Sequence, residues 1–313
     1  MGHCKHRNNS PKQFCQDMAF VSNGKLAGVA ARKLEDAESF AQKYDIEKTY
    51  QGYQALFDDP DIDIVYIATP HNFHYQNAYD ALKAGKSVLC EKPITISSEE
   101  SQKLSLFAKE QGLFLMEAMW TYFLPAIQQA KKWVKEGQIG KVKHIKADFG
   151  YPMPYDSQSR AYNRDLAGGC LLDMGIYPLA IANYFTDEPM TNLHVKSHFA
   201  PNGVDNDVIM LADGETRLTL ATSFQCKLPN LAYIIGEDGY IVIPDFWRAS
   251  ECSLYKLDDE IDSFSDQRDS IGLNYEANAV GIAIQQQLIE HPLMTHEMSL
   301  RLQKQMEQVK SHF

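Results

Sequence analysis

The sequence lacks the features that mark membrane, secreted and nucleic-acid-binding proteins. No apolar run approaches the roughly 18 residues that a membrane-spanning helix needs, and Met1 to Ser10 is polar, without the apolar core of a signal peptide. Lys and Arg form no dense stretch, and the net charge of −11 repels polyanions. We therefore expect a cytoplasmic protein that binds a small molecule and has neither a nucleic-acid nor a membrane partner.

Cysteine is scarce for a chain of 313 residues. The six cysteines stand at wide, irregular spacings in a chain long enough to fold without disulfides, so free thiols are expected. His3, Cys4, His6 and Cys15 contain ligand types for a metal, but no recognised zinc spacing, and no metal site is predicted.

The first part of the chain alternates short apolar runs with helical patterns. This order is typical of strand–helix–strand units and predicts a parallel, Rossmann-like sheet within residues 1–122. The expected strands are 25–31, 63–68, 87–90 and 114–116, and the expected helices are 34–44, 73–84 and 97–111.

The remainder, residues 123–313, is predicted to be an α+β domain with a large, mostly antiparallel sheet, so the fold class is α/β with two domains. Helices are expected at 125–135, 171–183 and 298–312, and strands at 142–149, 195–199, 208–212, 217–226, 232–236 and 240–243. An open sheet needs a cover on its second face, which predicts a homodimer formed through this sheet.

The strongest local motif is Glu91-Lys92-Pro93, where a buried apolar strand ends abruptly. Taken alone, this tripeptide is better interpreted as a solvated turn. However, 69–74 also follows a buried strand, and the carboxyl ends of parallel strands face the ligand crevice. Downstream, Gly168 and Gly169 open a helix on which Asp173 and Tyr177 are four residues apart, hence on one face.

These segments resemble the glucose-fructose oxidoreductase / inositol dehydrogenase superfamily, and within it the branch of dimeric dihydrodiol dehydrogenase and D-xylose dehydrogenase. The resemblance covers nearly everything after about Gln13. The matching segments are 30–32, 66–71, 88–93, 115–120, 168–177, 203–205, 235–239, 243–247 and 275–276.

The resemblance implies an oxidoreductase that transfers hydride between a nicotinamide and a small polyol, aldose or trans-dihydrodiol. It makes residues 1–122 the dinucleotide-binding domain and residues 123–313 the substrate-binding and dimerisation domain. It places Lys92 near the nicotinamide, and Asp173 and Tyr177 at the substrate; Arg160, in a variable loop, is a further substrate-binding candidate. Tyr177 as phenolate would take the substrate's hydroxyl proton, and the Lys92 ammonium would favour that phenolate. The implied cofactor-binding residues are Ala31, Arg32, Thr69, Pro70, His71, His74, Glu91, Lys92 and Trp120.

Cofactor choice depends on the residues that follow the strand expected at 25–31, which corresponds to the second strand of a dinucleotide fold. NAD-specific sites place an acidic residue there, against the ribose hydroxyls. This chain has Ala31-Arg32-Lys33, and a guanidinium suits the 2′-phosphate, so NADP is favoured while NAD stays possible.

One expected element does not occur in the sequence. Met1 to Pro11 contains neither the apolar first strand nor the G-x-G-x-x-G loop whose amides hold a pyrophosphate. We hypothesise that these residues reflect a shifted reading frame, because moving the frame forward by one base permits such a strand and loop.

Two other classes of function stay open on this scaffold. One is a non-catalytic sensor of a nucleotide or sugar, which need not retain the lysine and the tyrosine. The other is an NAD-assisted glycoside hydrolase, which would release sugar without net reduction of its cofactor.

Overall fold

The structure, a computed structural model, describes residues 10–313. The reading-frame hypothesis concerns mainly residues outside this range. The candidate metal ligands His3, Cys4 and His6 also lie outside the described residues. These residues group into two units, which we call the parallel-sheet unit (10–120 with 270–300) and the eight-stranded unit (121–269 with 301–313). The sequence predicted a single domain boundary after residue 122. In the structure, residues 270–300 group with the parallel-sheet unit.

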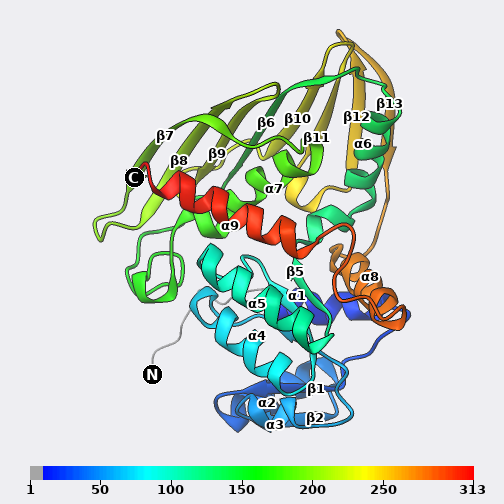
Figure 1. Cartoon of the computed structure of the whole chain (residues 1–313), viewed down its shortest axis with the longest axis vertical. Coiled ribbons are helices and arrows are strands. Elements are labelled where there is room, and N and C mark those ends of the chain that lie inside the picture. The colour runs from blue at the N-terminus through cyan, green and yellow to red at the C-terminus, as the bar shows by residue number, and fades with distance from the viewer. Residues whose placement is uncertain (1–9) are drawn as a thin grey trace. The chain divides into compact units, whose positions relative to one another are not determined.

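The parallel-sheet unit has five short strands, all parallel to their neighbours (Figure 1). They are β1 (Gly28–Ala31), β2 (Lys48–Gln51), β3 (Ile64–Ile67), β4 (Ser87–Glu91) and β5 (Leu115–Ala118). The helices are α1 (Ser10–Asp17), α2 (Leu34–Tyr44), α3 (Gln54–Phe57), α4 (His74–Lys83), α5 (Ser98–Gln111) and α8 (Leu273–Gln285). The long C-terminal helix α9 is His296–Lys310.

These five strands form two separate sheets. β1 pairs with β2, and β3 pairs with β4, which pairs with β5; among the described residues no pairing joins β1 to β3. One edge of β1 and one edge of β3 therefore carry unpaired backbone groups within this part of the chain.

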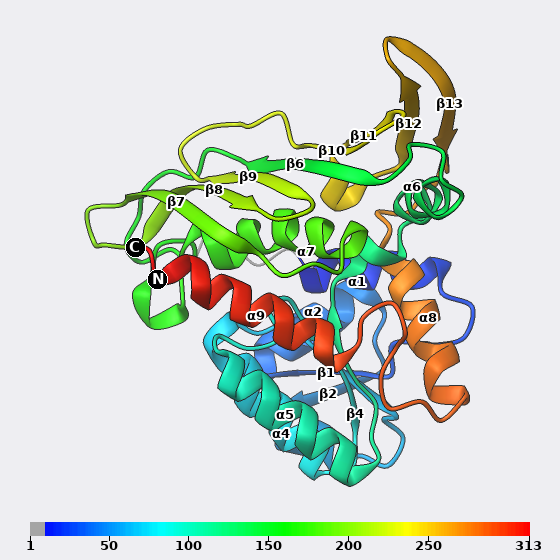
Figure 2. The same ribbon diagram turned by 45° about the horizontal axis from the view of Figure 1, so that its top comes forward.

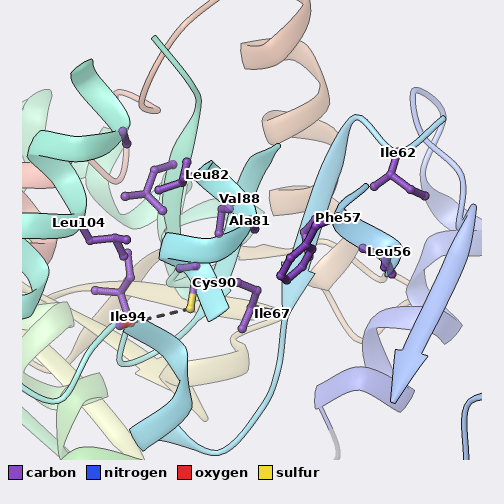
Figure 3. Packing of buried hydrophobic residues seen from close by; sticks show 14 residues of the cluster. Leu56, Phe57, Ile62, Ile67, Ala81, Leu82, Val88, Cys90, Ile94 and Leu104 are labelled. Carbon is purple, nitrogen blue, oxygen red and sulfur yellow. Dashed lines mark hydrogen bonds between the residues drawn. The ribbon is translucent and has the colours of Figure 1, made fainter. Parts of the chain in front are cut away.

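One apolar cluster nevertheless serves both sheets. Ile67, Val88 and Leu104 belong to its buried centre (Figure 3). The partly buried Ala30 and Tyr50 from the β1–β2 side pack against it. Helix α5 begins at Ser98, one residue after the predicted start, because Ser97 is its N-cap, whose hydroxyl accepts the Glu100 N–H.

The eight-stranded unit is built on one sheet in the order β13-β12-β11-β10-β6-β9-β8-β7, antiparallel except between β6 and β9. The strands are β6 (Val142–Gly150), β7 (Thr191–Phe199), β8 (Asp205–Asp213), β9 (Arg217–Ser223), β10 (Leu231–Gly236), β11 (Tyr240–Pro244), β12 (Glu251–Lys256) and β13 (Asp259–Ser265). Helices α6 (Pro125–Lys135) and α7 (Ile176–Phe185) lie on one face of this sheet (Figure 2). The predicted fold class is confirmed.

The sequence predicted no membrane-spanning helix, free cysteine thiols and no metal site. One helical stretch, Arg164–Phe185, is long and apolar enough to cross a bilayer, but 72% of its apolar 18-residue window is buried inside the protein. The five described cysteines are all free: Cys15, Cys90, Cys170, Cys226 and Cys252. Within residues 10–313 no group of three or more potential metal ligands occurs.

Candidate active site

The predicted site residues fall in both units, and each group is described within its own unit. The parallel-sheet unit holds the nine implied cofactor residues, and the eight-stranded unit holds Arg160, Asp173 and Tyr177.

The Glu91-Lys92-Pro93 turn directly follows the last residue pair of β4. Glu91 is 6% exposed and accepts a short hydrogen bond from the Tyr66 hydroxyl of β3. Burial first, and then the negative charge of Glu91, raise the pKa of Tyr66 well above its ordinary value, so Tyr66 remains a donor. Lys92 is half-buried and its peptide bond to Pro93 is cis.

A second buried acid lies beside this turn. Glu117 of β5 is 1% exposed, and its Oε1 accepts the backbone N–H of Ile94 at 2.9 Å. Burial raises the pKa of Glu117 to about 7, while the Ile94 N–H and the positive charge of Lys92 act in the opposite direction. Lys92 thus has an electrostatic partner on the neighbouring strand.

A third buried acid was missed as a functional candidate. Glu276, in the first turn of α8, is completely buried, and neither carboxylate oxygen has a hydrogen-bond partner among the described residues. Burial and then repulsion by Glu91 raise the pKa of Glu276 well above its ordinary value, which favours the neutral acid. The only sequence signal was the matching Tyr275-Glu276 segment.

The 69–74 loop returns from the end of β3 into α4. His74 is completely buried, and its ring nitrogens lie 2.7 Å from the carbonyl oxygens of Pro93 and Thr69. The Asn77 amide donates to the Thr69 hydroxyl at 3.0 Å, and His71 is 6% exposed. Thus His74 joins the residues that follow β3 to those that follow β4.

The residues that follow β1 are open to solvent. Ala31 is the last residue of the strand, and its carbonyl accepts the Gly52 N–H at 2.8 Å. Arg32 and Lys33 are exposed, and α2 begins directly after them at Leu34.

Trp120, also an implied cofactor residue, lies beyond the end of β5. Unlike Arg32, it is buried, with 5% of its surface exposed.

In the eight-stranded unit, Asp173 is held by Arg160. The Arg160 Nη2 lies 3.0 Å from both carboxylate oxygens of Asp173, and both side chains are largely buried. Asp173 lies in a π-helical turn, Leu171–Gly175, that leads into α7. This differs from the continuous α-helical face predicted for Asp173 and Tyr177, and π-helical turns of this kind are frequent at functional sites.

The glycine pair before this turn allows a close approach. Gly169 has φ +138°, and a Cβ there would lie 2.2 Å from the Oδ1 of Asp205. Asp205 is 7% exposed and accepts the Leu171 N–H at 2.7 Å, so it caps the start of the π-helical turn. Sequence reasoning gave Asp205 no role, although it lies in the matching segment 203–205.

Tyr177 is surrounded by aromatic rings. It is 6% exposed, with the ring of Phe149 edge-on at 5.4 Å and that of Trp247 at 6.2 Å. Phe149 and Trp247 stack on each other at 5.0 Å. This packing leaves the Tyr177 ring little rotational freedom.

Comparison with known families covers both units. Residues 4–119 match the oxidoreductase family with an NAD-binding Rossmann fold, and residues 127–242 match the GFO/IDH/MocA C-terminal domain. The chain belongs to the GFO/IDH/MocA family of oxidoreductases. Its parallel-sheet unit is therefore an NAD(P)-binding Rossmann domain, and the chain is an NAD(P)-dependent oxidoreductase of the polyol and dihydrodiol type.

Two individual relatives share one enzyme name. The chain is 33% identical over 285 residues to trans-1,2-dihydrobenzene-1,2-diol dehydrogenase of Xenopus tropicalis, covering 86% of this chain and 84% of that one. It is 32% identical over 298 residues to the Homo sapiens protein of the same name, covering 92% and 89%.

Solved structures share the fold. An aldose-aldose oxidoreductase from Caulobacter crescentus, complexed with glycerol, has a TM-score of 0.89 at 20% identity, covering 98% of this chain and 94% of that one. Levoglucosan dehydrogenase, in complex with NADH and levoglucosan, has a TM-score of 0.87 at 19% identity, covering 98% and 95%.

The described residues fit a dinucleotide in part. Glu91 and Lys92 at the end of β4 suit the nicotinamide half, and the exposed Arg32 suits the adenosine half. The glycine loop that would hold the pyrophosphate does not occur in the sequence of Met1 to Pro11, most of which lies outside the described part of the chain.

Proposed function

We propose that this protein is an NADP-dependent dehydrogenase that acts on a CH–OH group of a small polyol, aldose or trans-dihydrodiol. The observation that carries the proposal is the position of Lys92, which follows the central strand of its sheet beside two buried carboxylates, Glu91 and Glu117. A protein that only senses a ligand would not need a lysine at this strand end. The names of the dihydrodiol dehydrogenase relatives support the substrate class.

In the oxidising direction, Tyr177 accepts the proton of the substrate hydroxyl, and Lys92 binds beside the nicotinamide. The bound nicotinamide supplies the hydride acceptor. Asp173, fixed by Arg160, accepts a hydrogen bond from a second substrate hydroxyl and thereby orients the reacting carbon.

The experiment is an assay of NADPH formation with a panel of aldoses and trans-dihydrodiols. Lys92→Met and Tyr177→Phe should each lower kcat/KM by about 100-fold or more, the range expected for loss of a proton-transfer group. The exposed residues Lys103 and Tyr155 provide matched controls, since Lys103→Met and Tyr155→Phe should leave kcat/KM unchanged. Unchanged turnover in the first two variants would contradict the proposal.

The same assay separates the other classes. Sugar release without net cofactor reduction would identify a glycoside hydrolase, and nucleotide binding without any turnover would identify a sensor.

Arg32 supports NADP as the preferred cofactor. Its guanidinium is exposed at the carboxyl end of β1, where it can bind a 2′-phosphate bidentately, and no acidic side chain occupies the position. Arg32→Gly should lower the preference for NADP over NAD by about tenfold or more, the loss expected for one charge-assisted contact. An unchanged ratio of kcat/KM values would contradict this assignment.

We further propose a cytoplasmic homodimer, formed through the sheet face opposite α6 and α7. Ile209 and Leu211 are 46% and 47% exposed on that face. Tyr240 stacks on Tyr255 at 5.0 Å, and Tyr233 lies next to them. Sedimentation should show a dimer that Ile209→Lys converts to monomer, whereas Ile261→Lys on β13 should not; a monomeric unaltered protein would contradict the proposal.

A further inference from the structure

The side chain of His74 has an unusual pair of neighbours. Nδ1 lies 2.7 Å from the carbonyl oxygen of Pro93, and Nε2 lies 2.7 Å from the carbonyl oxygen of Thr69. Both distances are those of good hydrogen bonds, and the side chain is completely buried.

The chemistry of these partners restricts the protonation state. A carbonyl oxygen accepts hydrogen bonds and cannot donate one, and a neutral imidazole carries only one N–H. In a neutral His74, one ring nitrogen would therefore direct its lone pair at a carbonyl lone pair across 2.7 Å. Only the imidazolium, with an N–H on each nitrogen, makes both contacts attractive. Two charge-assisted bonds also offset part of the cost of burying the charge.

We propose that His74 is a doubly protonated imidazolium that fastens the end of β3 to the end of β4 and positions Lys92. Thr69 and Pro93 follow two paired strands, in which Ile67 lies opposite Cys90. Lys92 directly precedes Pro93, so a bond to the Pro93 carbonyl restricts the backbone that carries the lysine. His74 is thus a positioning residue for the dinucleotide site.

The surroundings of His74 supply two further observations. The Asn77 amide, one turn along α4, bonds to the Thr69 side chain and gives the same loop a second attachment. The ring of His71, on the same segment, lies edge-on to it at 5.6 Å. The loop is therefore held from two sides, with the charged bonds at its buried end.

The protonation state is tested directly by nitrogen NMR of the histidine rings in the unaltered protein at pH 8. Ordinary histidines, with pKa about 6.5, are almost wholly neutral there. We expect one ring whose two nitrogens both carry protons, and this signal should be absent in His74→Gln and present in His71→Gln. If no doubly protonated ring occurs at pH 8, the proposal is overturned, whether or not any variant folds.

The positioning role rests on the proposed role of Lys92, and a double-mutant cycle on the Kd for NADPH tests it separately. We expect His74→Gln to weaken binding about tenfold when Lys92 is present, and about twofold or less in the Lys92→Met background, because residues that act through one another are not additive. Gln76→Leu, an exposed neighbour on α4, should leave the Kd unchanged. An equal loss in both backgrounds would overturn positioning while leaving the NMR result intact, and a failed dehydrogenase assay would not alter either measurement.

Discussion

The carboxylate of Asp17, at the end of α1, accepts the backbone N–H of Leu273, at the start of α8, at 2.7 Å. It also accepts the N–H groups of Ile271 and Gly272, at 2.9 Å and 2.8 Å. Asp17 is 2% exposed, so a residue distant in sequence caps α8 from the protein interior. These bonds attach the start of α8 to the rest of the parallel-sheet unit.

Asp17→Ala should therefore lower the free energy of unfolding by about 2 kcal/mol or more, because it leaves three backbone donors, two of them buried, without their charged acceptor. Asp17→Asn retains one acceptor oxygen and should lose less. Denaturant unfolding of both variants measures the difference. A loss below about 0.5 kcal/mol in Asp17→Ala, the range of ordinary surface substitutions, would show that water replaces the cap.

Much of this architecture is predictable from the sequence, since long amphipathic patterns fix helix bounds. The helices expected at 34–44 and 125–135 have those bounds in α2 and α6. The hairpin β12–β13 was missed, because its second strand, DEIDSFS, is mostly exposed and has too few apolar residues for a strand pattern. Asp17 and Glu276 were missed because their roles depend on tertiary contacts.

The candidate site was predictable to a similar degree. The Glu91-Lys92-Pro93 turn was found because an apolar run ends in charged residues, which is a local signal. The buried environment of Lys92, with Glu117 on the next strand, depends on strand pairing and has no local signal. The π-helical turn at Asp173 was also missed, because residue spacing alone cannot distinguish it from an α-helical turn.

Glu276 makes the stability of the protein depend on pH. Its pKa is raised in the folded state, so ionisation costs stability once the pH exceeds its unfolded value of about 4.3. Stability should fall as the pH rises from there towards the raised folded pKa, by at most about 1.4 kcal/mol per pH unit for one group.

Glu276→Gln should remove this contribution. The variant should be as stable as the unaltered protein near pH 4 and increasingly more stable at higher pH, as measured by urea unfolding at a series of pH values. A constant difference between the two proteins across pH would mean that Glu276 does not titrate abnormally. Glu99→Gln, an exposed residue of α5, serves as the control for loss of one carboxylate.

The positive charge of Lys92 should also affect the pKa of Glu117. Its positive charge is one of the groups that hold down the pKa of Glu117, which is about 7. Lys92→Met should therefore raise that pKa further, and the carboxyl signal of Glu117, followed by carbon NMR or infrared difference spectra, should titrate at higher pH. Lys103→Met should not move it. An unmoved titration would show that the ammonium of Lys92 lies farther from Glu117 than the structure places it.

The break in the parallel sheet leads to the last prediction. Strands β1 and β3 share an apolar cluster but have no pairing with each other among the described residues. Helix α1 runs ahead of β1, and a strand leading into α1 would complete a strand–helix–strand unit with β1. Such a strand could pair with β1 on one side and β3 on the other.

The reading-frame hypothesis predicts that the source DNA, shifted by one base over the codons for Met1 to Pro11, encodes this apolar strand and a glycine-containing loop. A protein carrying it should exchange the amide hydrogens of β1 and β3 more slowly, because their free edges become paired, while those of β7 in the other unit stay unchanged. It should also bind NADPH more tightly, since a glycine loop at the start of α1 supplies N–H donors for the pyrophosphate. If the DNA contains no such frame, the hypothesis fails. If the added strand leaves exchange in β1 and β3 unaltered, the space between these strands is already filled.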